Sequence, residues 1–163
     1  MGGHIPNRRN HPMSKRLENL NSIVGVLAAG AKFYRQSARQ AGNADLERIF
    51  LEHADLRETT GRNIAQVIDD AGAEPAEAAA GEQARAMAAK VGTLFNDTAE
   101  TLVGSLEEHE DRTLEVFRNA IHHKDNNRDE QMLRDYMAEF EKSHERMRQL
   151  KQAKNPKSAA ADV

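Results

Sequence analysis

Apolar side chains recur at intervals of three and four residues in four stretches of the chain, the spacing that keeps them on one face of an α-helix. The pattern predicts helices over residues 14–41, 44–71, 97–123 and 127–153. In chain order, the expected inward positions are Leu17, Leu20, Val24, Leu27, Ala31, Tyr34, Ala38; Leu46, Ile49, Phe50, Leu56, Ile64, Val67, Ile68; Leu102, Val103, Leu106, Leu114, Phe117, Ile121; and Leu133, Tyr136, Met137, Phe140, Met147, Leu150. The predicted fold class is therefore all-α.

The ends of the first two helices carry recognisable signals. Ser14 is a suitable N-cap for the first helix, because its hydroxyl can accept a hydrogen bond from a free backbone N–H of the first turn. Gly42 stops that helix and Asn43 caps the second. Gly72 ends the second helix. The connection at Gly42 and Asn43 is short, which predicts that the first two helices form an antiparallel hairpin.

The remaining connections differ in length. Residues 72–96 are rich in Ala, Glu and Gly and predict a long crossover with a short helix inside it. Asp97-x-x-Glu100 resembles a capping box that opens the third helix. Residues 122–126 predict a tight turn, after which Asn127-x-x-Glu130 caps the fourth helix. Two antiparallel hairpins joined by a crossover have the connectivity of a ferritin-like four-helix bundle.

The predicted domain is flanked by two segments without helical periodicity. Residues 1–13 are expected to be a flexible leader, residues 14–153 the bundle, and residues 154–163 a flexible tail. The longest nearly apolar run, Ser22–Ala31, is about half of what a membrane-spanning helix needs, so no membrane association is expected. Polar residues before that run argue against a secretion signal, and a cytoplasmic location is predicted.

Composition narrows the possible functions. The 163 residues include no Cys, which excludes disulfides and thiol catalysis. The 23 basic and 26 acidic side chains are mixed along the chain and leave a formal net charge of −3, so no nucleic-acid partner is expected. There is no Gly-rich phosphate loop or nucleophile elbow, and the sequence favours a protein that is not an enzyme.

Several polar residues fall on the inward stripes at one height of the predicted bundle. This height follows from a rise of about 1.5 Å per residue, counted from the helix ends. The layer comprises Tyr34, His53, Arg57, Glu110 and His144. Buried polar groups cost several kcal/mol unless they are paired. We therefore expect Arg57 to pair directly with Glu110, and Tyr34, His53 and His144 to complete the hydrogen bonds around them.

A metal site is the alternative interpretation of this layer. Ferritin-like di-metal bundles use one Glu from each of two helices and Glu-x-x-His from each of the other two. Glu141 and His144 form one such motif, and Glu107 or Glu110 supplies the single Glu of the third helix. The first two helices lack the remaining ligands. An iron or manganese site would therefore use Glu107, Glu110, Glu141 and His144, whereas the preferred interpretation has no cofactor.

Four short motifs occur together in a fixed order along residues 17–150. They are Gly30-x-x-x-Tyr34; Phe50-x(6)-Arg57; Glu107-x-x-Glu110-Asp111 followed by Phe117-x-x-Ala120; and Ser143-His144-x-Arg146-Met147-x-x-Leu150. Together they resemble a bacterial ferritin-like four-helix-bundle family of unknown function. His109 departs from that pattern, which often has Gly there. The resemblance implies a ferritin-related fold and no established activity.

The functional prediction is a non-enzymatic bundle, linked to stress responses only by analogy with ferritin relatives. The alternative is an iron- or manganese-binding or redox protein that uses the site between the third and fourth helices. Val26 and Phe33 are expected on the outward side of the first helix, either under the crossover or in a subunit contact. They motivate the prediction of a homodimer.

Overall fold

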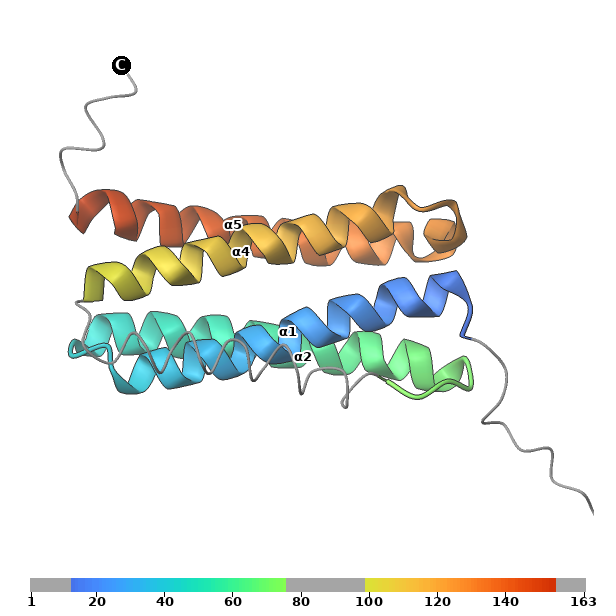
Figure 1. The fold of residues 1–163 in the computed structure, drawn as a ribbon, viewed down its shortest axis with the longest axis horizontal. Helices are drawn as coiled ribbons and strands as arrows, with labels where there is room; N and C mark the ends of the chain where they lie inside the picture. The colour runs from blue at the N-terminus through green and yellow to red at the C-terminus, as the bar shows by residue number, and fades with distance from the viewer. Residues whose placement is uncertain (1–12, 76–98, 155–163) are drawn as a thin grey trace, which may run out of the picture.

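In the computed structural model, residues 13–75 and 99–154 are described and are entirely helical or in short connections. The long helices are α1 (Lys15–Arg39), α2 (Ala44–Asp70), α4 (Ala99–His122) and α5 (Glu130–Lys154). They lie side by side along one axis, with α1 and α2 forming one hairpin and α4 and α5 the other (Figure 1). This confirms the all-α fold and the four predicted long helices. The predicted crossover helix and the Asp97-x-x-Glu100 cap fall outside the described residues.

The predicted caps of the first hairpin are confirmed. The Oγ atom of Ser14 accepts a hydrogen bond of 3.3 Å from the backbone N–H of Leu17, and Asn43 Oδ1 accepts from the N–H groups of Asp45 and Leu46. Gly42 has a φ of +63°, a left-handed conformation that glycine adopts without a steric penalty. The chain can therefore reverse direction between α1 and α2 over very few residues.

The connection between α4 and α5 differs from the prediction. The expected turn and the expected Asn127 cap are wrong, because Lys124–Asp129 form a 3-10 helix, η3, which His123 caps, and α5 begins at Glu130. The cause is a polar cluster that draws this connection onto α1. Arg16 donates two hydrogen bonds to Asp129, of 2.7 and 2.8 Å, and Asn126 is completely buried.

The buried amide of Asn126 is satisfied on both sides. Its oxygen accepts from Asn19 at 2.7 Å, and its nitrogen donates to the Arg16 carbonyl and to Asp129. Because these partners lie on α1 and on η3, the cluster joins the start of the first hairpin to the loop of the second.

The hydrophobic core consists of two clusters. One contains Leu20, Leu27, Ile64, Phe117 and Phe140 among its buried members, and the other contains Phe33, Phe50, Leu106 and Met147. Between them lie buried polar side chains from all four long helices. The fold thus encloses a polar layer between two apolar clusters.

Val26 and Phe33 do not face outward as predicted. Val26 is 2 % exposed and Phe33 is 5 % exposed, and the Phe33 ring contacts the ring of His109 on α4 edge-on. Since α1 packs against both α2 and α4, its buried arc is wider than one stripe. These two residues therefore do not provide an exposed subunit contact.

None of the helices in the described ranges is both long enough and apolar enough to cross a membrane.

Replacing Asn126 with alanine should lower the free energy of unfolding by about 1–3 kcal/mol, because the Arg16 carbonyl and Asn19 lose a buried partner. Chemical denaturation of the full chain measures this loss. The exposed neighbour Asn127 provides the control, and Asn127→Ala should change stability by less than about 0.5 kcal/mol. Equal effects of the two substitutions would contradict the role given to Asn126.

Candidate functional site

The polar layer is centred on Arg57 of α2, which is completely buried. Its Nη2 atom donates a 2.5 Å hydrogen bond to Glu110 Oε1 on α4, and its Nη1 atom donates to the carbonyl oxygen of His53. The guanidinium also lies over the Tyr34 ring, 4.5 Å from its centre, and 5.2 Å from the centre of the Phe140 ring. The charge of Arg57 is thus matched by one carboxylate and by two aromatic faces.

Glu110 is the shared acceptor of this layer. Its Oε1 atom accepts hydrogen bonds from the Tyr34 hydroxyl on α1 and from Ser143 Oγ on α5 as well as from Arg57. A single carboxylate oxygen therefore connects all four long helices.

The charged form of Glu110 is favoured despite its burial. Burial alone would raise the pKa of this carboxyl, but the Arg57 guanidinium and the neighbouring His53 and Tyr34 outweigh that effect and hold the pKa at about 2. Burial and the negative charge of Glu110 raise the pKa of Tyr34 well above its usual value. Tyr34 consequently remains a protonated hydrogen-bond donor.

The layer contains the residue types of a hydrolytic triad, Ser143, His53 and Glu110, but they are not arranged as in a triad. Ser143 Oγ is 3.0 Å from His53 Nδ1, and Glu110 Oε1 is 3.6 Å from the same ring nitrogen. In a triad the acid and the nucleophile occupy opposite ring nitrogens. Here Ser143 donates its proton to Glu110, so His53 Nδ1–H is the donor toward Ser143. All three side chains are buried, and the arrangement activates no nucleophile.

Four of the five residues predicted for the layer lie together, and His144 does not. His144 points to the border of the bundle, where its Nε2 atom is 2.8 Å from Asp111 Oδ1. Ser143, one position earlier, takes its place beside Glu110. One residue rotates a side chain by about 100° around a helix, and the buried stripe of α5 runs through Phe140, Ser143 and Met147.

The four residues of the metal hypothesis do not converge. Glu110 lies in the layer, while Glu107 lies at the border and binds Lys151 of α5. Glu141 is exposed, and His144 is paired with Asp111. Within the described parts of the chain, no three His, Cys, Asp or Glu side chains are grouped in a way that could hold a metal ion.

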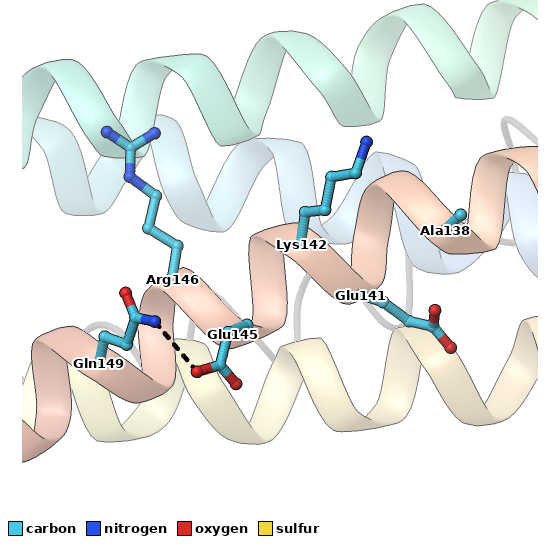
Figure 2. Close-up of a pocket in the computed structure, with 6 residues that line it drawn as sticks. All are labelled: Ala138, Glu141, Lys142, Glu145, Arg146 and Gln149. Atoms are coloured by element: carbon cyan, nitrogen blue, oxygen red, sulfur yellow. Dashed lines mark hydrogen bonds between the residues drawn. The ribbon is translucent and has the colours of Figure 1, made fainter.

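Glu141 instead contributes to a surface hollow along α5. Its lining, drawn in Figure 2, consists of Ala138, Glu141, Lys142, Glu145, Arg146 and Gln149. Lys142 and Arg146 extend toward α2, whereas Glu141 lies on the side of α4 (Figure 2). Both cations have acidic partners, since Lys142 binds Glu139 and Arg146 binds Glu52. The hollow therefore offers no uncompensated charge from these two residues to a ligand.

His109 and Gly30 belong to the layer although neither was predicted there. His109 is 3 % exposed, and burial followed by the charge of Arg57 lowers its pKa to about 4. A Cβ atom on Gly30 would lie 2.3 Å from His109 Nε2 and 2.9 Å from Arg57 Nε. The absence of a side chain at Gly30 thus makes room for both residues. Spacing alone could have indicated His109, which lies three residues after Leu106 and four before Thr113.

One family model matches the chain, over residues 15–123, and its description is Domain of unknown function (DUF2383). The match covers more than half of the chain, and the chain belongs to this family. No curated protein and no solved structure matches the chain. The matched residues include Tyr34, His53, Arg57 and Glu110, whereas Ser143 lies on α5 beyond them.

Gly30→Ala should destabilise the protein by about 1–3 kcal/mol, because the added methyl group would overlap His109 and Arg57. Gly25 of the same helix is the matched control, since a Cβ there meets no atom of residues 13–75 or 99–154 within 4 Å. Gly25→Ala should stabilise the protein by about 0.5–1 kcal/mol through the better helix propensity of alanine. Thermal or chemical denaturation compares the two variants, and a stabilising Gly30→Ala would contradict the close packing.

Glu110→Gln should lower the free energy of unfolding by about 3–5 kcal/mol, because it leaves the Arg57 guanidinium buried without a countercharge. Glu108→Gln on the exposed face of α4 is the control and should have almost no effect. Arg57→Leu should also destabilise, whereas Arg57→Leu combined with Glu110→Leu should recover part of the loss. Denaturation midpoints of the two single leucine variants and of the double variant measure the interaction energy between Arg57 and Glu110. Stability changes that simply add would exclude such an interaction.

Proposed function

We propose that this protein is a non-enzymatic, ferritin-like helical bundle whose buried layer carries an Arg57–Glu110 ion pair where a metal centre would otherwise lie. The observation that carries the proposal is the 2.5 Å contact between a guanidinium and a carboxylate that are both completely buried. A resident positive charge at this position repels a divalent cation and already neutralises the central carboxylate.

The arrangement of the helices supports ferritin-like connectivity. In Figure 1, α2 and α4 run in the same direction, so that α2 ends at the opposite end of the bundle from the start of α4. The end of α2 and the start of α4 are therefore a bundle length apart, as are the helix ends that the long connection of a ferritin-like fold joins. A bundle of this kind can serve as a structural or interaction module without a reactive group.

The donor set also argues against a resident iron or manganese ion. A carboxylate-bridged site needs several acidic or imidazole ligands around one point. Of the four candidate ligands, Glu107 and His144 are engaged by Lys151 and Asp111, and Glu141 is exposed. Only Glu110 of this set points into the layer, and Arg57 occupies the space beside it.

The chain expressed in medium containing iron and manganese should carry far less than one ion per molecule. Elemental analysis and the absorption spectrum measure this directly. His144→Ala and the exposed-histidine control His122→Ala should leave the result unchanged. Near-stoichiometric metal that disappears in His144→Ala and remains in His122→Ala would overturn the proposal in favour of the metal-binding alternative.

A further inference from the structure

His109 is a buried ionisable group that the proposed function does not use. It lies between α1 and α4, with the Phe33 ring edge-on at 6.2 Å. On the α1 side, the ring is so close to the backbone of Gly30 that even a Cβ atom there would overlap Nε2. The imidazole therefore has no free space on this side in which to rotate or to admit water.

The surroundings of His109 favour its neutral form. Neither ring nitrogen makes a hydrogen bond of normal geometry to the described residues, and the Val26 carbonyl on α1 is the backbone group that favours a proton there. The nearby charges are Arg57 from α2, and Glu110 and Arg112 from α4. From α5, the layer receives Ser143, which is uncharged. Glu110 is already paired with Arg57, so a second positive charge would be poorly compensated.

We propose that His109 is a proton-sensitive latch between α1 and α4: the neutral ring permits the closed packing at Gly30, and protonation favours opening of this contact. Opening brings the ring into water, where an imidazole binds a proton at ordinary affinity. The closed form binds that proton less readily. A fall in pH from about 6.5 toward about 4 therefore shifts the equilibrium toward the open form, and a rise in pH restores the closed form.

Hydrogen exchange of the whole 163-residue chain, at pH 7 and pH 5 in buffer with a chelator, tests the latch. Protection factors, which correct for the intrinsic pH dependence of exchange, should fall by roughly 20-fold at pH 5 for α1 amides around Gly30. In His109→Gln, which cannot be protonated, they should stay within about twofold between the two pH values. The exposed-histidine control His122→Gln should keep the wild-type fall.

Unchanged protection in the wild type, or the same fall in His109→Gln, would overturn the proposal. A second measurement does not depend on the folding of the variant. Titration of the wild-type histidine ring protons by NMR should give His109 a midpoint below about 5, and a midpoint near 6.5 would equally overturn the latch. Because the chelator removes bound metal, these outcomes are independent of the test of the proposed function.

Discussion

The buried ion pair between Arg57 and Glu110 is the interaction on which the rest of the bundle depends. A guanidinium in an apolar interior requires an acid, and the acid comes from the other hairpin. The same carboxylate oxygen accepts from Tyr34 and Ser143, so each long helix contributes one group to a single point. Contacts between apolar side chains tolerate a shift along the helix axis better than several hydrogen bonds to one oxygen atom do. The pair therefore sets the relative height of the four helices, while the two apolar clusters on either side supply most of the burial.

The size of Arg57 imposes a second constraint on the helices around it. Arg57 is among the largest fully buried side chains, and it shares its plane of the bundle with His109, Tyr34 and Phe140. Close packing at this level requires a neighbouring position with almost no volume, which is Gly30. A glycine in a helix interior usually costs stability relative to alanine. At this position the cost is offset because any larger residue would overlap His109 and Arg57.

The sequence was sufficient to predict most of this layer, for an identifiable physical reason. Tyr34, His53, Arg57 and Glu110 interrupt long apolar stripes, and counting from the helix ends gives them a common height. The prediction of His144 in the layer was wrong, because a border residue and an inward residue differ by one position along α5. The prediction for the α4–α5 connection was also wrong, because Asn126 and Asp129 bind residues of α1 that lie more than a hundred positions earlier. Local turn chemistry contains no information about such distant partners.

The charge balance of the layer explains how a polar interior remains compatible with a stable fold. The charges of Arg57 and Glu110 cancel. Tyr34 is held in its neutral form because burial and the adjacent carboxylate both oppose loss of its proton. His109 is neutral because burial and Arg57 both oppose gain of a proton. Burial is the larger cause in both groups, and one member of the ion pair adds to it: Glu110 at Tyr34 and Arg57 at His109. The layer consequently resists a second charge of either sign, and a change that removed one member of the pair would alter the protonation preference of its neighbours as well as the packing.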